Sequence, residues 1–155
     1  MTKLKVLVFS DSHRSLSGMY FAIETHHPDQ VIHLGDLMED AQEVACAYPR
    51  LPFCMVPGNC DGWTTEPPKK QILLAGKRIL LSHGHLWGVK KGPYAAIADA
   101  RASNADLLLY GHTHQAVLRT LEDGLILLNP GASRSTYGLI ELTHSSIDCC
   151  ILPQE

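Results

Sequence analysis

The sequence predicts a mixed fold of the α/β class, with crossover units in its first half and antiparallel hairpins in its second half. In the first half of the chain, apolar runs of strand length recur roughly every 20–30 residues, and each ends in a polar or glycine-containing turn. These runs are Lys5–Phe9, Val31–Leu34, Phe53–Val56 and Ile79–Ser82. Continuous apolar runs are typical of strands that are buried on both faces of an α/β sheet.

Three further segments predict helices, namely Leu16–Thr25, Glu39–Tyr48 and the alanine-rich Tyr94–Ser103. The first carries apolar residues at helical spacing, which are Leu16, Met19, Tyr20 and Ile23. Helices of this length between strands are typical of crossover units, so the first half of the chain predicts an α/β arrangement.

The second half predicts antiparallel hairpins. Gln71–Leu74 and Arg78–Leu81 are separated by a short glycine-containing turn, and an Asp-Gly pair lies between Val117–Leu121 and Leu125–Leu128. A third pair of runs is Tyr137–Leu142 and Ile147–Leu152. No linker, repeat or low-complexity segment interrupts the pattern, so residues 1–155 predict one domain.

Composition excludes several classes of protein. The 155 residues are 45% apolar and carry a net charge of −3, so we expect no broad basic surface for long nucleic acids or anionic lipids. No apolar run approaches the ~20 residues of a membrane span, and none has the length of a signal peptide. Five cysteines without a Cys-x-x-Cys pair predict a reduced, cytoplasmic protein.

Five short motifs rich in metal-ligand side chains each follow a strand candidate. They are Asp11-Ser-His13, Gly35-Asp36, Gly58-Asn-Cys-Asp61, His83-Gly-His85 and Gly111-His-Thr-His114. Each motif alone is compatible with ordinary turn chemistry. In α/β sheets, however, active sites lie outside the carboxyl ends of the strands, and the five together predict a common site there.

The number of donors predicts two metal ions. A tetrahedral ion takes four ligands, whereas two ions that share one carboxylate would use the whole set. The expected ligands are Asp11, His13, Asp36, Asn59, His83, His112 and His114, with His85 in reserve. Mixed imidazole and oxygen donors suit manganese, our first choice, or iron, nickel, cobalt or zinc. With two aspartates, two divalent ions leave a net charge of about +2, which suits hydrolysis of a phosphate ester.

These motifs resemble the signature of the calcineurin-like metallophosphoesterase superfamily. The similarity extends from Lys3 to about Leu142 and is strongest to its small single-domain prokaryotic phosphodiesterases. Those proteins also carry Gly-Asn-Cys-Asp, Ser-His-Gly-His and Asn-Pro-Gly-Ala patterns, found here at residues 58–61, 82–85 and 129–132. The resemblance implies a mixed-sheet β-sandwich flanked by helices, with a dinuclear metal site at the carboxyl-terminal edge of its strands.

The resemblance also implies roles for individual residues. One ion would be held by Asp11, His13, Asp36 and His114, and the other by Asp36, Asn59, His83 and His112. Asp36 would then bridge the ions, Asn59 would contribute a neutral amide oxygen, and a metal-bridging water or hydroxide would be the nucleophile of a phosphodiesterase. Manganese-dependent hydrolysis of a small phosphodiester is therefore the expected activity.

One departure from the family pattern concerns the leaving group. Many members have a histidine at the position of Cys60, and that histidine is the usual candidate for protonating the leaving group. A thiol with an ordinary pKa near 8.5 is a poor substitute, unless a nearby cation lowers that pKa. The candidate proton donors are therefore Cys60, His85 and a metal-bound water. His85 is equally compatible with a structural role. Arg14 is a candidate for substrate binding, although an exposed arginine needs no such role.

Several other residues keep two interpretations. His33 is expected to be a strand histidine, and Asp61 to cap a turn or orient a ligand. The Asn129-Pro-Gly-Ala132 segment either approaches the site or turns the chain. Trp63 and Trp87 lie close to ligand motifs, so they either wall a substrate pocket or fill an interface.

Alternative functions also remain. The same ligands suit a phosphomonoesterase or a nucleotide phosphohydrolase. A retromer subunit resembles this fold and serves as a protein-interaction scaffold, so the fold alone does not establish catalysis. We expect a small phosphodiester as the partner, together with homo-oligomers such as a dimer or tetramer, for which the apolar terminal hairpin is a candidate surface.

Overall fold

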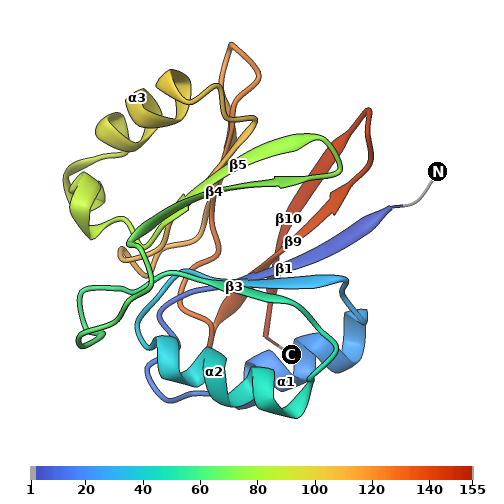
Figure 1. Ribbon diagram of the computed structural model, residues 1–155. Helices are drawn as coiled ribbons and strands as arrows, with labels where there is room; N and C mark the ends of the chain where they lie inside the picture. Colours follow the sequence, from blue (N-terminus) through green and yellow to red (C-terminus); the bar gives the residue numbers. More distant parts are fainter. Residues whose placement is uncertain (1–2, 155) are drawn as a thin grey trace.

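The computed structural model describes residues 3–154, which form two five-stranded sheets packed face to face. Helices α1 and α2 cover the outer face of one sheet, and α3 covers the other (Figure 1). The helices are α1 (Ser17–His26), α2 (Met38–Ala47) and α3 (Tyr94–Ala102), with two short 3₁₀ turns at His85–Trp87 and Val89–Lys91. This arrangement confirms the predicted sandwich flanked by helices.

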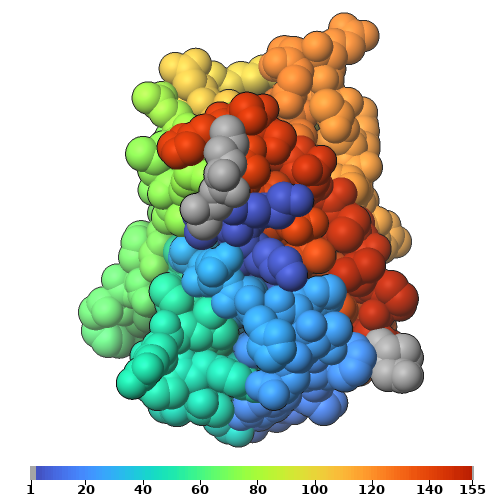
Figure 2. Space-filling model, turned by 90° about the vertical axis from the view of Figure 1, so that its right-hand side faces the viewer, coloured from blue at the N-terminus to red at the C-terminus, as the bar shows by residue number. Residues whose placement is uncertain are grey.

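The first sheet contains both ends of the described chain. Its strands run in the order β10-β9-β1-β2-β3, with β1, β2 and β3 parallel and the last two strands antiparallel to their neighbours. The strands are β1 (Leu4–Phe9), β2 (Gln30–His33), β3 (Phe53–Met55), β9 (Thr136–Leu142) and β10 (Ile147–Pro153). Figure 2 shows the red C-terminal hairpin against the blue N-terminal strand, and Val6 pairs with Ile140.

The second sheet corrects the expectation that the second half is antiparallel. Its strands run in the order β4-β5-β6-β8-β7, and β5, β6 and β8 are parallel to one another. The strands are β4 (Lys69–Leu74), β5 (Lys77–Ser82), β6 (Leu107–Leu109), β7 (Val117–Thr120) and β8 (Ile126–Asn129). The three hairpins form as expected. The sequence pattern did not single out β6 because three leucines are too short a run to identify a strand.

Side-chain alternation along the strands builds three apolar layers. Val6 and Val8 point between the sheets, where they join Leu107, Leu109 and other apolar residues. The alternate residues of the same strand point outward and pack against α1 and α2. A third cluster packs α3 onto the second sheet. Both faces of the central strands are therefore covered, which explains their continuous apolar runs.

Within residues 3–154, no helix is long and apolar enough to cross a membrane.

The layer between the sheets should dominate the stability of the protein. Leu107 is fully buried there, so Leu107→Ala should lower the free energy of unfolding by about 2–5 kcal/mol. Leu73 is 66% exposed, and Leu73→Ala is the matched control, expected to change stability by less than about 0.5 kcal/mol. Urea denaturation followed by circular dichroism measures both values. Equal losses in the two variants would contradict this account of the core.

Candidate metal centre

The predicted ligand motifs meet where the two sheets adjoin. The segments that carry Asp11, Asp36 and Asn59 follow β1, β2 and β3 of the first sheet. Those that carry His83 and His112 follow β5 and β6 of the second sheet. The carboxyl ends of parallel strands from both sheets therefore contribute to one region, as the positions of the motifs predicted.

One candidate ligand group contains Asp11, His13 and His114, whose ligand atoms all lie within 4.8 Å of one another. The Oδ1 atom of Asp11 is buried and has no hydrogen-bond partner among the described residues. It lies 3.2 Å from His114 Nε2, 3.7 Å from His83 Nε2 and 4.0 Å from His13 Nε2. A buried carboxylate oxygen without a donor is costly, and a bound cation would satisfy it.

A second candidate group contains Asp36, His83 and His112. The Oδ2 atom of Asp36 lies 3.3 Å from His83 Nε2, and the same nitrogen lies 3.1 Å from His112 Nδ1. Asp36 Oδ2 is also 3.9 Å from His13 Nε2 of the first group. Asp36 therefore lies between the two groups, with one oxygen facing both.

The hydrogen bonding of His83 prepares its Nε2 atom for a cation. Its Nδ1 atom lies 2.7 Å from the carbonyl oxygen of Leu34, so Nδ1–H donates to that carbonyl and the neutral ring keeps a lone pair on Nε2. This is the orientation that metal-bound histidines usually have. The donor chemistry and the partnerless Asp11 oxygen thus fit a divalent metal.

The same contacts shift the acid–base behaviour of the pair in the absence of metal. Burial disfavours the charged forms of both Asp36 and His83. Their mutual contact, together with the Cys60 N–H at Asp36 and the Asp11 carboxylate near His83, outweighs it. These contacts hold the pKa of Asp36 well below its ordinary value and raise the pKa of His83. A cation would have to replace the proton that His83 shares with this carboxylate.

Asp61 fixes the position of Asp36. Its carboxylate accepts hydrogen bonds from the backbone N–H groups of Asp36 (3.1 Å), Met38 (2.7 Å) and Gly58 (2.7 Å). The backbone N–H of Cys60 in turn donates to Asp36 Oδ1 at 2.8 Å, which leaves Oδ2 to face the imidazoles. Asp61 therefore joins the loops after β2 and β3, in agreement with the orienting role expected for it.

A buried polar chain supports the loop after β1. His33 Nδ1 accepts the Gly35 N–H at 3.1 Å, and its Nε2 lies 3.0 Å from Ser12 Oγ. The Ser12 hydroxyl donates to Asp40 Oδ2 at 2.7 Å, and the same oxygen accepts the backbone N–H of Arg14. Burial lowers the pKa of His33 to about 4, so this ring is neutral. His33 is a strand histidine, as expected.

Of two other supporting residues, Asp40 was missed, and Asn129 belongs to a segment whose role the sequence left open. Asp40 has no local signal beyond its place in the first turn of a helix. Asn129 donates to the Gly111 carbonyl at 3.2 Å and to Thr113 Oγ1 at 2.9 Å, and its Oδ1 accepts the Gly131 N–H. Asn129 thus holds the loop that carries His112 and His114 through its side chain. The Asn-Pro-Gly-Ala pattern was the available signal.

The remaining predicted residues surround the two groups. The His85 ring centre lies 5.5 Å from that of His83, and its buried Nδ1 has no partner among the described residues. Cys60 is exposed, and burial together with the neighbouring Asp36 carboxylate raises the pKa of its thiol. The Asn59 amide nitrogen lies 3.7 Å from Cys60 Sγ. Arg14, whose side chain is 80% exposed, lies 3.8 Å from Glu39 Oε1.

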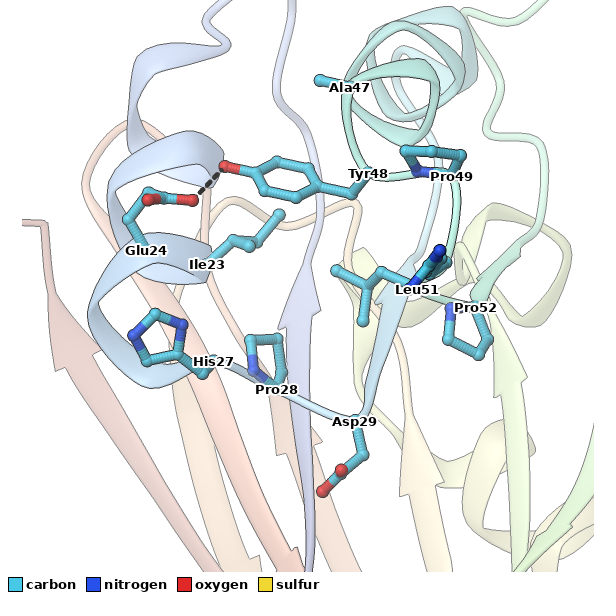
Figure 3. Close-up of a pocket in the computed structure, with 11 residues that line it drawn as sticks. Ile23, Glu24, His27, Pro28, Asp29, Ala47, Tyr48, Pro49, Leu51 and Pro52 are labelled. Carbon is cyan, nitrogen blue, oxygen red and sulfur yellow. Dashed lines mark hydrogen bonds between the residues drawn. The ribbon is translucent and has the colours of Figure 1, made fainter.

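A separate cavity lies at the opposite ends of β2 and β3. It measures about 540 Å³ and is lined by the ends of α1 and α2 and by the segments that lead into these strands (Figure 3). The Tyr48 hydroxyl donates to Glu24 Oε2 at 2.7 Å across its upper part. Neither candidate ligand group contributes to its lining, so the candidate metal centre is not in this cavity.

Fold and candidate site together are those of a phosphoesterase that binds divalent metals. The profile of the calcineurin-like phosphoesterase superfamily domain matches residues 4–147, and the chain belongs to this superfamily. A Bacillus subtilis relative, the probable metallophosphoesterase YsnB, is 34% identical over 135 residues, or 84% of this chain and 76% of YsnB. Phosphodiesterase YfcE of Escherichia coli is 29% identical over 100 residues, or 56% of this chain and 50% of YfcE.

Solved structures show the same fold. A predicted phosphoesterase from Streptococcus pneumoniae superposes with a TM-score of 0.80 at 24% identity, covering 99% of this chain and 91% of that protein. Vps29 from Entamoeba histolytica, solved with zinc, has a TM-score of 0.74 at 21% identity, covering 98% and 100% of the two chains. These identities support similarity of fold alone.

The loop after β3 should control metal affinity. A Cβ atom at Gly58 would overlap Asp36 Oδ1, whereas one at Gly62 would meet no atom within 4 Å. Gly58→Ala should therefore displace Asp36 and weaken manganese binding by about 10- to 100-fold, and Gly62→Ala should leave it unchanged. Calorimetric titration of manganese into chelator-treated protein measures this, with thermal melts as the folding control. Equal manganese affinities in the two variants would show that metal binding does not depend on the present position of Asp36.

Proposed function

We propose that the protein is a phosphodiesterase that uses two divalent metal ions to hydrolyse a small phosphodiester. The observation that carries this proposal is the position of Asp36, whose Oδ2 atom faces imidazoles of both candidate ligand groups. A single carboxylate shared by two ligand groups is the arrangement that a dinuclear site requires. The family binds divalent metals, and two ions are our interpretation of the donor set.

We assign the ligands as the sequence motifs suggested. Asp11, His13, Asp36 and His114 would hold one ion, and Asp36, Asn59, His83 and His112 the other. Asn59 would have to supply its amide oxygen from the exposed loop that also carries Cys60. The mixture of imidazole and oxygen donors favours manganese, with iron, nickel, cobalt or zinc as alternatives.

The chemistry depends on charge. Two divalent ions, when bound, would activate a water molecule and stabilise the negative charge that develops on the phosphate. The ligand side chains would hold these ions in place. Asp61, Asn129 and the His33–Ser12–Asp40 chain support them through hydrogen bonds to the loops that carry the candidate ligands.

The surroundings of the site favour substrates with a good leaving group. Burial lowers the pKa of His85, so His85 would be neutral and act poorly as an acid. The raised pKa of Cys60 keeps its proton on the thiol, which is likewise a weak acid. Activated aryl phosphodiesters should therefore react faster than alkyl phosphodiesters.

Diesters are preferred to monoesters in this proposal. The Escherichia coli relative YfcE is named a phosphodiesterase, which supports the preference. A phosphomonoesterase or nucleotide phosphohydrolase uses the same ligands and is the alternative within enzymes. The Vps29 match supports a different alternative, a protein-interaction scaffold of the same fold. Against that reading, every expected metal ligand is present in this sequence.

The proposal also covers the cellular compartment, the oligomeric state and the partners of the protein. Five free cysteines suit a reducing, cytoplasmic compartment. We propose a homo-oligomer, with the terminal hairpin of β9 and β10 as the contact surface, because several of its apolar residues are only partly buried. Long nucleic acids and membranes are not proposed as partners, since the net charge is −3.

Hydrolysis of bis(p-nitrophenyl) phosphate and p-nitrophenyl phosphate tests the activity. Chelator-treated protein should be inactive, and manganese should restore turnover, with the diester hydrolysed faster than the monoester. Asp36→Ala should reduce turnover to the chelated background because it removes the shared ligand. Glu122→Ala removes an exposed carboxylate in the turn between β7 and β8 and is the control, expected to keep full activity. Manganese binding without turnover of either ester would favour the scaffold.

The residue at position 60 should set the range of leaving groups. Cys60→His would place an imidazole, a better acid near neutral pH, beside Asp36, whose Oδ1 accepts the Cys60 N–H. The variant should hydrolyse methyl p-nitrophenyl phosphate at a similar rate and dimethyl phosphate or other alkyl diesters at least about tenfold faster. The measurement is the rate for the alkyl diester divided by the rate for methyl p-nitrophenyl phosphate, in the variant and in the wild type. An unchanged ratio would show that position 60 does not protonate the leaving group.

A further inference from the structure

A second hollow adjoins the candidate metal centre. It measures about 360 Å³ and lies beside the loop after β3 and the start of α2. Its lining includes Arg14, Gln42, Cys60, Trp63 and Thr64. Cys60 connects the hollow directly to the site, since its backbone N–H donates to Asp36 Oδ1 at 2.8 Å. Cys60 therefore belongs both to the lining of the hollow and to the contacts of Asp36.

Trp63 is the unusual member of the lining. It is 91% exposed, so its indole contributes almost nothing to the core of the protein. Trp87, the other tryptophan, is partly buried, and its Nε1–H donates to Asp99 Oδ2 at 3.0 Å. Of the two interpretations open from the sequence, Trp87 therefore has a structural explanation, and Trp63 has none within the described residues.

The planar and polar groups of the hollow suit an aromatic ligand with hydrogen-bonding edges. Arg14 contributes a planar guanidinium, which lies 3.8 Å from the carboxylate of Glu39, another residue of the lining. Asp61, which also lines the hollow, is already occupied by three backbone N–H groups. The Gln42 amide makes no side-chain hydrogen bond within residues 3–154, so it can pair with the edge of a base. Nucleobases stack on both indole and guanidinium planes.

We propose that this hollow binds a nucleobase, with Trp63 as its stacking surface, so that the natural substrate class is a nucleotidyl phosphodiester. The proposal rests on the hydrolysis proposed above and makes it more specific. The base would lie against Trp63, and the phosphate would reach the region of Asp36. Trp63 is then a specificity residue and takes no part in the chemical step.

Two substrates with the same leaving group isolate the contribution of the base. Thymidine 5′-p-nitrophenyl phosphate carries a base, and methyl p-nitrophenyl phosphate does not. Trp63→Ala should lower kcat/KM for the thymidine ester by about 5- to 150-fold and leave that for the methyl ester unchanged. Trp63→Phe should retain most of the activity because a smaller aromatic ring remains. An equal loss on both esters, or none on either, would overturn the proposal.

A binding measurement separates this inference from the proposed hydrolysis. Thymidine 5′-monophosphate should quench the tryptophan fluorescence of the manganese-loaded protein, and ribose 5-phosphate, which has no base, should not. Quenching should persist in Trp87→Phe and disappear in Trp63→Phe. Quenching of Trp63 without turnover of any ester would support the base site and reject hydrolysis. Turnover of both esters with no quenching of Trp63 would support hydrolysis and reject the base site.

The same variants test the other interpretation of an exposed tryptophan. If Trp63 fills an interface between copies of the chain, Trp63→Ala should change the sedimentation coefficient of the protein. The nucleobase proposal expects an unchanged coefficient in wild-type protein, Trp63→Ala and Trp63→Phe. A change in the variants, together with loss of activity on both esters, would assign Trp63 to an interface instead.

Discussion

The burial of the Asp11 carboxylate is the constraint on which the rest of the site depends. Asp11 is 1% exposed, and its Oδ1 lies among three imidazole nitrogens with no hydrogen-bond donor among the described residues. Such an oxygen is expensive to bury unless a positive charge is present. The two sheets must meet at this point because the histidines come from both of them. A positive charge at this point would therefore offset the cost of burying Asp11 and would also serve the proposed chemistry.

The site is also built on unfavourable backbone conformations. Positive φ angles, which glycine tolerates best, occur here at a run of side chains around the site, namely Asp11 (55°), His13 (43°), Arg14 (71°), Asp36 (52°), His112 (72°) and His114 (62°). Each such residue costs of the order of 1 kcal/mol or more, and strain of this kind persists only where the surroundings enforce it. The hydrogen bonds of Asp61, Asn129 and Asp40 supply that enforcement. This explains why so much buried polar structure surrounds a small number of ligands.

The candidate metal ligands and the residues proposed to bind the base lie on different parts of the loops. The candidate ligands lie at the strand ends and are held by buried networks, whereas Trp63 and Arg14 are exposed and make few contacts. Substitutions at the exposed positions can therefore alter the preferred ester without disturbing the metal centre. Cys60 lies between the two sets, since its N–H holds Asp36 and its side chain lines the second hollow. Changes at this position would affect both the reaction and its specificity.

The sequence by itself determined the strands of the first sheet, the three helices, the hairpins and the set of candidate ligands. It could do so because apolar runs, helical spacing and short polar motifs are local signals. Tertiary structure decided that the last hairpin pairs with β1, that β6 and β8 are parallel, and that Asp36 Oδ2 faces both ligand groups. It also decided the hydrogen-bonding roles of Asp40 and Asn129. Those depend on contacts between residues far apart in the chain, such as the Ser12–Asp40 and Asn129–Gly111 hydrogen bonds, and no local pattern specifies such contacts.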